Sequence, residues 1–443
     1  MFISKISLET IFRVLIRGYL FVLPWQTVWI VRERYLNGYK WQYGATQFFL
    51  SEAVAWIVFL LFFWWSGRRV ARAVKENKIV FSWTPDRVFT LFVLIFILYS
   101  FLSVVWSPVR EIAFQHSIHL LEAILLFFVI YLGPTTKKEI IFWFLLGSVI
   151  PAILGIAQFL AQTTWPAPWL GLSAHLPSEA GTAIVGGSGR WLRAYGSFAH
   201  PNIFGGYLAL VLMSVFYFIS DNPIQKSGKK IILSLFIVII SAALFFSFSR
   251  SAAGMLVAAF ALFGGLGLWN KTLSKNFAVF LSLPILIFFI GGIIYSPLVK
   301  TRLVGISASE ITSVQERISG YDEAGRIIAR HPWLGVGSGN YTVAAYLLDN
   351  SRPGWEYQPA HNTALLFTAE MGVVGVIIFL GLSASFVRYF RLIKPKKNWH
   401  LELFLLIPLI FGLSFDHYFW SLPVEMFSFA TYLGIIFRPT VHS

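Results

Sequence analysis

The stretch that decides the fold is residues 231–269, IILSLFIVIISAALFFSFSRSAAGMLVAAFALFGGLGLW, in which a single charged residue, Arg250, separates two apolar runs. Each run, 231–248 and 252–269, comes close to the roughly 20 apolar residues that cross a bilayer as a helix. The turn between them is too short for a soluble segment. We therefore expect a tight hairpin of two membrane helices, with Arg250 at the outer interface.

The same pattern extends along the whole chain. Of 443 residues, 57% are apolar and 12% are charged, whereas a soluble domain is about 45–50% apolar and about 25% charged. The mean hydropathy is +0.70. We expect an all-α polytopic membrane protein with about 12 transmembrane helices. The predicted spans are residues 12–31, 48–65, 88–106, 114–132, 139–161, 203–219, 231–248, 252–269, 277–296, 363–387, 401–417 and 421–437.

The net charge of +15 arises from 35 basic and 20 acidic residues. With a cytoplasmic N-terminus, most of the basic residues fall in the inner segments, although the outer segments include the longest loops. The positive-inside rule then places both termini in the cytoplasm. Because the basic excess is spread over every inner loop, it indicates topology, and we expect no nucleic-acid partner. The absence of cysteine excludes disulfides and thiolate metal sites.

The chain is expected to divide into three parts. Residues 1–296 hold transmembrane helices 1–9, residues 297–360 form a large periplasmic loop, and residues 361–443 hold helices 10–12. Within the loop, apolar residues recur every three or four positions between Ser313 and His331, which predicts a surface helix. The glycines of residues 335–340 favour a tight turn over a nucleotide-binding loop, because no Lys-Ser/Thr follows them.

The segment Pro359-Ala360-His361-Asn362 marks the change from the polar loop to the apolar helix expected from Thr363. Asn362 is a suitable N-cap, and the dipole at a helix N-terminus favours the neutral form of the His361 imidazole. A neutral imidazole can accept a proton from a hydroxyl group. Taken alone, the same pair also fits a histidine that only forms hydrogen bonds among lipid headgroups.

Arginines mark two other outer segments. Arg250, flanked by serines at the start of a helix, fits either an interfacial anchor or an anion site completed by free backbone N–H groups. Arg190 and Arg193 precede Pro201-Asn202, where proline suits a first helical turn and asparagine suits its cap. Two arginines beside a rigid helix start offer a bidentate clamp for phosphate, although a loop cation explains them equally simply.

Other polar groups give weaker signals. The spacing of His116, His119 and Glu122 on one predicted span could share a metal, but no outer carboxylate cluster accompanies it, and no metal site is predicted. Asp416-His417-Tyr418, between the last two spans, fits either a polar group that supports a site or a simple loop. Three outer acids remain candidates without a motif to select one: Glu33, Glu52 and Glu356.

Taken in order, these segments resemble the motifs of the O-antigen ligase and polymerase superfamily of polytopic bacterial glycosyltransferases. They are Arg193-Ala194-Tyr195-Gly196-Ser197-Phe198 with Pro201-Asn202; Ser249-Arg250-Ser251-Ala252-Ala253-Gly254; Arg317 with His331-Pro332-Trp333-Leu334-Gly335-Val336-Gly337-Ser338-Gly339-Asn340; and His361-Asn362 with Glu370-Met371-Gly372-Val373-Val374-Gly375. Each motif is short and degenerate. Four in this order, on one side of the membrane, are specific to the superfamily and much less specific to a member.

The resemblance implies a helical fold of the membrane glycosyltransferase C type (GT-C) and glycan transfer on the outer face. The donor would be a glycan on a polyprenyl (undecaprenyl) pyrophosphate carrier, transferred with inversion and without metal or other cofactor. By position, Arg193 and Arg250 would bind the pyrophosphate and His361 would be the catalytic base. Arg317, Asn362 and Arg190 would support them. The sequence departs from the family pattern at Tyr321, where tryptophan is expected.

The leading expectation is an O-antigen ligase of the bacterial inner membrane that transfers a finished glycan to lipid A-core at a periplasmic active site. A single dominant outer loop favours a ligase slightly over the alternatives in the same superfamily, a glycan polymerase and a protein O-oligosaccharyltransferase. A transporter for the lipid-linked glycan is less favoured, because transporters usually show repeated halves and polar groups at the midplane.

Overall fold

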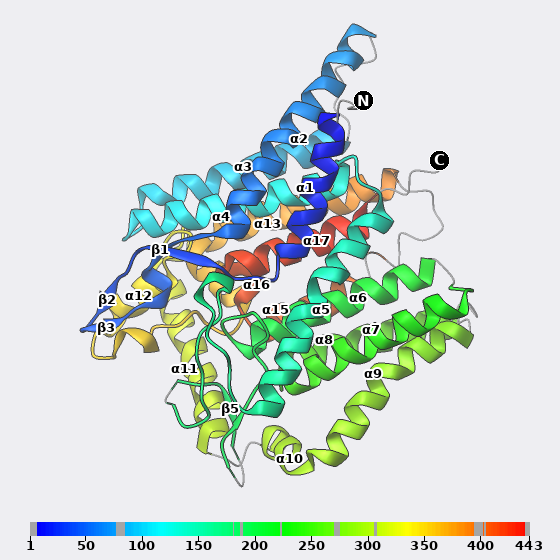
Figure 1. The fold of residues 1–443 in the computed structure, drawn as a ribbon. Helices are drawn as coiled ribbons and strands as arrows, with labels where there is room; N and C mark the ends of the chain where they lie inside the picture. Colours follow the sequence, from blue (N-terminus) through cyan, green and yellow to red (C-terminus); the bar gives the residue numbers. More distant parts are fainter. Residues whose placement is uncertain are drawn as a thin grey trace.

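The computed structural model describes residues 7–76, 85–179, 181–186, 189–221, 224–269, 275–304, 308–393, 402 and 405–438. Figure 1 shows a helical bundle with short strands and small helices gathered at one end. Within the described residues, eight helices are long and apolar enough to cross a membrane, which confirms the predicted all-α polytopic fold. They are α2 (Leu50–Lys75), α3 (Pro85–Leu102, extended by the 3-10 turn η2, Ser103–Val105), α4 (Arg110–Leu132), α5 (Lys137–Ala161), α6 (Pro201–Asp221), α7 (Ser227–Phe246), α9 (Lys275–Ile294) and α13 (Thr363–Ile393).

Helices also occupy the other four predicted spans: α1 (Leu8–Val22), α8 (Arg250–Trp269), α15 (Leu406–Phe415) and α17 (Pro423–Phe437). The first span was predicted too far along the chain, because the helix ends before Pro24 and residues 28–32 form a strand. Proline has no backbone N–H to continue a helix. Residues 401, 403 and 404 of the predicted span 401–417 lie outside the described residues.

Among the described residues, three pairs of short antiparallel strands lie in the connecting segments. Strand β1 (Val28–Arg32) pairs with β4 (Thr46–Phe49), β2 (Tyr35–Leu36) with β3 (Tyr39–Lys40), and β5 (Ile184–Val185) with β6 (Trp191–Leu192). Asn37 and Gly38 join β2 to β3 with φ angles of 52° and 81°, as the two central residues of a type I′ turn require. The pair β1–β4 therefore lies directly before α2 and covers the end of the bundle near α4 (Figure 1).

The remaining short helices are α10 (Ser296–Val304), α11 (Ala308–Arg330), α12 (Tyr341–Leu348), α16 (Tyr418–Ser421) and the 3-10 turns η1 (Gln42–Gly44), η3 (Pro168–Leu170) and η4 (Gly354–Glu356). The surface helix predicted between Ser313 and His331 is confirmed as α11, which begins earlier. Its apolar face is buried only in the second half: Ala324 and Ile327 are buried, whereas Val314 and Ile318 are exposed.

Helix α6 lies at the centre of the bundle, because 89% of the residues in its apolar 18-residue stretch are buried inside the protein. It packs against α5, α7, α8 and α17. Such a helix is apolar all round because it has protein on every side. Its N-terminus therefore opens among the ends of other helices rather than at the periphery, and the candidate site lies there.

A break in α13 receives the glycine turn of residues 335–340. Gly372 has φ 62° inside the helix, and the freed backbone groups pair with the turn: Val336 N–H donates to the Ala369 carbonyl at 3.0 Å, and Gly337 N–H donates to the Glu370 carbonyl at 2.8 Å. A Cβ on Gly335 would lie 2.3 Å from the Glu370 carbonyl oxygen. These glycines form a tight turn, as predicted, because the two backbones touch.

Candidate active site

Asp416 joins several helix ends at the centre of the candidate site. It lies between α15 and α16 and is only 3% exposed. Its Oδ1 lies 3.3 Å from His361 Nδ1 and accepts from the backbone N–H of His417, and its Oδ2 accepts from Asn202 Nδ2 at 3.4 Å and from Ser251 Oγ at 3.3 Å. One carboxylate thus connects the N-terminal ends of α6, α8 and α13.

His361 directly precedes α13 and is positioned from several directions. The side chain of Asn362 accepts from Leu365 N–H at 3.0 Å, which confirms the predicted N-cap, and its amide donates to the Ser414 carbonyl at 3.0 Å. The hydroxyl of Tyr321, from α11, donates to the His361 carbonyl at 3.2 Å. The tyrosine at the unexpected position therefore contacts the site directly. The His361 side chain remains 23% exposed.

His417 completes the group that we name the aspartate cluster: His361, Asp416 and His417. The His417 ring meets that of His361 edge to face, with centroids 5.0 Å apart, and its Nδ1 lies 2.6 Å from Ser421 Oγ. Burial lowers the pKa of His417 to about 3. Burial raises the pKa of Asp416, but the hydrogen bond with His361 and the electrostatic interactions with His361, His417 and Arg317 outweigh it, so the net pKa is well below its usual value. The cluster therefore holds one ionised carboxylate beside two imidazoles.

Three arginines surround the turn of residues 247–250, which joins α7 to α8. Arg193 is 4% exposed and donates from Nε to the Ser247 carbonyl at 2.8 Å and from Nη2 to Asn202 Oδ1 at 2.5 Å. Arg302, from α10, is buried and donates to the Phe248 carbonyl at 3.1 Å. Arg250 is the half-buried first residue of α8, adjacent to Ser251, which donates to Asp416.

The predicted supporting arginines lie in different places. Arg317, on α11, is half-buried and acts electrostatically on Asp416 and His417. Arg190 is exposed, and its guanidinium donates to the carbonyls of Pro177 and Glu179 in its own loop. Arg193, through Asn202, and Arg317 thus act on the aspartate cluster, and Arg250 is the sequence neighbour of Ser251, which contacts it. Arg190 instead bonds within the loop of residues 162–200.

The start of α6 differs in detail from the expectation. Helix α6 begins at Pro201, so Asn202 is the second helical residue, and His200 is the cap: its Nδ1 accepts from Asn202 N–H at 3.1 Å. This leaves the Asn202 side chain free to bridge Arg193 and Asp416. Burial and the charge of Arg193 lower the pKa of His200 to about 3, so it caps the helix as a neutral ring.

A cavity of about 570 Å³ opens onto the aspartate cluster. Its walls include His361, Asp416 and His200, together with amide and aromatic side chains such as Gln158 and Trp355. Pockets of this size, with a few convergent polar groups, are where small-molecule sites form. None of its described lining residues is a lysine or arginine, so the arginines border the cluster from the side of the 247–250 turn.

Two groups of side chains in the described part of the chain have metal-ligating geometry: the aspartate cluster, and Glu52 with His119 and Glu122. The spacing of His116, His119 and Glu122 does not bring all three together. His116 lies 2.7 Å from Ser338 Oγ and 2.8 Å from the Trp420 carbonyl, whereas His119 Nε2 lies 2.8 Å from Glu52 Oε1. Side chains three residues apart on a helix lie on nearly the same face. Here, however, each histidine contacts a different set of partners.

Asp416 and Arg302 are among the residues of the site that were not assigned from the sequence. Asp416 was left open between a supporting group and a loop, and its signal was a carboxylate within an otherwise apolar C-terminal segment. Arg302 was not singled out, and its signal was an arginine placed shortly after a predicted span. Neither residue belongs to the segments that carried the resemblance. Each contacts a partner more than 50 residues away in sequence, so no local pattern connects it to the site.

These features define a class of protein: a polytopic helical membrane protein with a histidine–aspartate pair, bordered by arginines, at the ends of its helices. Residues 235–380 match the family model described as O-antigen ligase, and this match supports the resemblance of the chain to the O-antigen ligase and polymerase superfamily. The match includes α8, α11 and His361. No curated protein matches the chain.

Proposed function

We propose that this protein transfers a glycan from a polyprenyl pyrophosphate carrier to the hydroxyl group of an acceptor, as an O-antigen ligase that uses lipid A-core. The observation that carries the proposal is the contact between His361 Nδ1 and Asp416 Oδ1 at the wall of the large cavity. A buried carboxylate on one ring nitrogen fixes which nitrogen carries the proton. With Nδ1–H directed at Asp416, Nε2 is left to accept a proton.

In the proposed reaction, the acceptor hydroxyl gives its proton to His361 Nε2 as its oxygen attacks the anomeric carbon of the donor sugar. A new C–O bond forms, the bond to the pyrophosphate oxygen breaks, and attack opposite the leaving group inverts the anomeric configuration. Asp416 stabilises the imidazolium that results, in the way that a triad aspartate does. The dipole of α13 favours the neutral ring before transfer, and Asp416 stabilises the ring after it is charged.

The leaving pyrophosphate requires positive charge, and the arginines around the 247–250 turn can supply it. Arg250 lies at the N-terminus of α8, where backbone N–H groups also favour an anion. Arg317, on α11, acts electrostatically on Asp416. Arg193 is buried and bonded to protein groups, so we assign it the tasks of adding charge and of holding Asn202 against Asp416. Preorganised cations of this kind stabilise charge that develops in a transition state.

We further propose that the protein lies in the bacterial inner membrane with both termini in the cytoplasm and the aspartate cluster in the periplasm. The distribution of basic residues supports this orientation. In this arrangement residues 297–360, which contain α10, α11 and α12, form the periplasmic segment between the ninth and tenth predicted spans. Carrier and acceptor are both amphiphiles and would reach the site from the bilayer.

The test is reconstitution of the purified protein with an undecaprenyl-pyrophosphate-linked glycan and lipid A-core. A ligase forms glycan-substituted lipid A-core and releases undecaprenyl pyrophosphate. Carrier-linked glycan of greater length would instead identify a polymerase, and glycan on an added protein acceptor would identify a protein O-oligosaccharyltransferase. Movement of intact donor across the membrane, without any transfer, would overturn the enzymatic proposal.

A further inference from the structure

A second polar group lies inside the bundle, away from the proposed chemistry. We name Glu52, His119 and Glu122 the glutamate cluster. Glu52 lies in the first turn of α2, and His119 and Glu122 lie one turn apart on α4. They are 2%, 7% and 1% exposed, and one ligand atom from each lies within 4.8 Å of the others. Ionisable groups in a membrane bundle are costly and commonly have a function.

The charge of the glutamate cluster is not balanced by a permanent cation. The ion pair recorded for Glu52 is with His119, and none of the ion pairs among the described residues joins Glu52 or Glu122 to a lysine or arginine. Two carboxylates and one imidazole therefore lie together, with no ion pair to a lysine or arginine among the described residues. Buried carboxylates must be paired, protonated or bound to a metal.

Two buried polar atoms at this place also lack a hydrogen-bond partner. One is Glu122 Oε2, and the other is the hydroxyl of Tyr19 on α1. Tyr19 is 1% exposed and lies within electrostatic reach of both glutamates. Buried polar atoms in native proteins are nearly always satisfied. An orphaned carboxylate oxygen beside an imidazole points to a ligand that accepts lone pairs, such as a cation.

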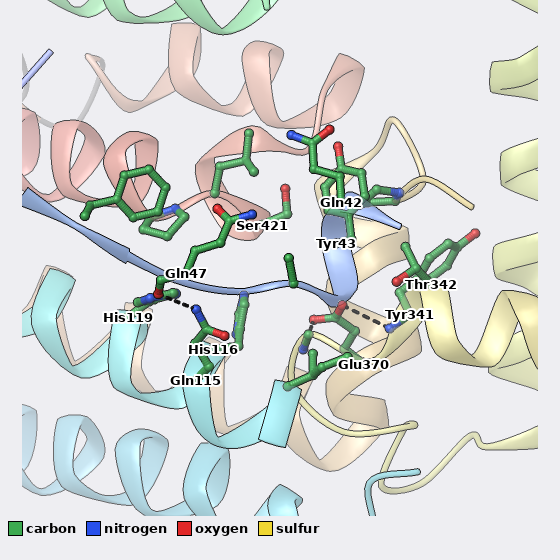
Figure 2. A pocket seen from close by; sticks show the side chains of 17 residues that line it. Gln42, Tyr43, Gln47, Gln115, His116, His119, Tyr341, Thr342, Glu370 and Ser421 are labelled. Atoms are coloured by element: carbon green, nitrogen blue, oxygen red, sulfur yellow. Dashed lines mark hydrogen bonds between the residues drawn. The ribbon is translucent and has the colours of Figure 1, made fainter. Parts of the chain in front are cut away.

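A cavity borders the glutamate cluster at His119. His119 lines a cavity of about 90 Å³ that runs beneath β4 (Figure 2). Gln47 and Gln115 lie beside it, and Gln115 donates to the Gln47 carbonyl at 2.8 Å. The cavity continues toward Tyr341 and Glu370 on the other side. The cavity therefore leaves open space beside His119.

We propose that Glu52, His119 and Glu122 bind one divalent transition-metal ion, with zinc as the representative ion. One imidazole nitrogen and two carboxylate oxygens suit such an ion, and a water or the Tyr19 hydroxyl can complete four ligands. Tetrahedral ligands at about 2.0–2.1 Å from zinc stand about 3.3 Å apart, so the present 2.8 Å between His119 and Glu52 would open by about 0.5 Å. The ion ties α2 to α4 below the β1–β4 strands.

The aspartate cluster is the competing site, and its composition argues against it. It has one carboxylate, which already accepts hydrogen bonds from Asn202, Ser251 and the His417 backbone. Arginine charges surround it, and these repel a cation. The glutamate cluster has the higher negative charge and the orphaned oxygen. The two sites also differ in a measurable way, because one offers a single imidazole and the other offers two.

The experiment uses the full chain, purified in detergent with an affinity tag that contains no histidine and stripped with a chelator. We expect about one zinc ion per chain to rebind and to raise the midpoint of thermal unfolding. Glu122→Gln should weaken zinc affinity at least about tenfold and abolish the thermal shift. His417→Gln is the matched control and should retain both.

X-ray absorption at the zinc edge tests the wild-type protein directly, so the proposal stays testable even where a variant fails to fold. We expect one imidazole and otherwise oxygen ligands. Two imidazoles, or zinc binding that survives Glu122→Gln but is lost in His417→Gln, would move the metal to the aspartate cluster and overturn the assignment. Failure of the wild-type protein to bind zinc, or to gain thermal stability from it, would also overturn the assignment.

Discussion

The aspartate cluster and the glutamate cluster are built from the same types of side chain and differ in charge. The first combines one carboxylate with two imidazoles and is bordered by Arg193, Arg250 and Arg317. The second combines two carboxylates with one imidazole and has no arginine or lysine in its described ion pairs. A carboxylate with cations around it can stay ionised and support a charged imidazole. Two carboxylates without such cations need a proton or a metal.

Exposure separates the clusters as well. The His361 side chain is 23% exposed at the wall of a large cavity, whereas the His119 side chain is 9% exposed. A general base must come within hydrogen-bond reach of its substrate. The exposure of His361 therefore suits the proposed exchange of protons with an acceptor, whereas the burial of His119 suits the proposed retention of a metal ion.

The largest expected effect tests whether the aspartate cluster is the acid–base centre. We predict that His361→Gln lowers the rate of glycan transfer by about 10²–10⁴-fold, the usual contribution of a general base. Asp416→Asn should lower it as well, since the ring loses the charge that stabilises imidazolium. The measurement is product formation under single-turnover conditions with reconstituted donor and acceptor.

The double variant sharpens the result. The effects of mutating residues that act as a unit do not add. The double variant of His361→Gln and Asp416→Asn should therefore transfer the glycan only slightly more slowly than His361→Gln alone. The matched control is His119→Gln in the glutamate cluster, which should lower thermal stability and leave the single-turnover rate near that of wild type. A folded His361→Gln protein that transfers at the wild-type rate would remove the base assignment.

The next effect concerns the arginines that only the aspartate cluster has. Arg250→Ala and Arg317→Ala should each weaken binding of undecaprenyl pyrophosphate by roughly 1.5–3 kcal/mol, the value of a hydrogen bond to a charged group. Calorimetric titration of the carrier into protein in nanodiscs measures it. Arg190→Ala is the control: its side chain is exposed and bonds within its own loop, so we expect a change below about 0.5 kcal/mol. Equal losses at all three positions would contradict a specific pyrophosphate site.

Much of this comparison could be foreseen from the sequence, and some of it could not. Apolar runs of about 20 residues predicted the transmembrane helices, since the membrane selects apolar residues locally. The Asn362 cap and the surface helix followed from residues within one or two turns. The partnership of His361 with Asp416 joins residues 55 apart, and that of Glu52 with His119 joins α2 to α4. Such contacts depend on how helices pack, which no local pattern encodes.

A local rule also failed at the start of α6. Asparagine is the better N-cap by propensity, yet His200 caps the helix and Asn202 turns to Arg193 and Asp416. Asn202 does not cap the helix because its side-chain amide accepts a hydrogen bond from the Arg193 guanidinium and donates one to the Asp416 carboxylate. Departures of this kind from local preference are expected at functional sites.

A pH effect follows from the neutral histidines near Asp416. The pKa of His200 is lowered to about 3, whereas an unfolded histidine has a pKa of about 6.5. As pH falls below about 6.5, the unfolded chain binds a proton that the folded chain does not, so stability decreases, by up to about 1.4 kcal/mol per pH unit for each such group. His200→Asn keeps a capping side chain and removes the titration. Its unfolding midpoint should therefore fall less than that of wild type between pH 7 and pH 5, both measured by thermal unfolding in detergent; equal falls would refute the neutral cap.

The smallest effect concerns the helix caps at the starts of α2 and α13, which lie beside the two clusters. Glu52 accepts from the Phe49 N–H at the start of α2, and Asn362 accepts from Leu365 N–H at the start of α13. Asn362→Ala should cost about 1 kcal/mol of stability, the usual value of an N-cap, whereas Asn362→Asp keeps the acceptor and should cost less, because a carboxylate suits the helix N-terminus. Thermal unfolding of the two variants measures this difference.

Asn362→Asp also brings a second carboxylate next to the aspartate cluster and so shifts its charge toward that of the glutamate cluster. If charge distinguishes the two clusters, Asn362→Asp should be the more stable variant and yet the slower enzyme, whereas parallel changes in stability and transfer rate would show that Asn362 acts on the site only through the helix.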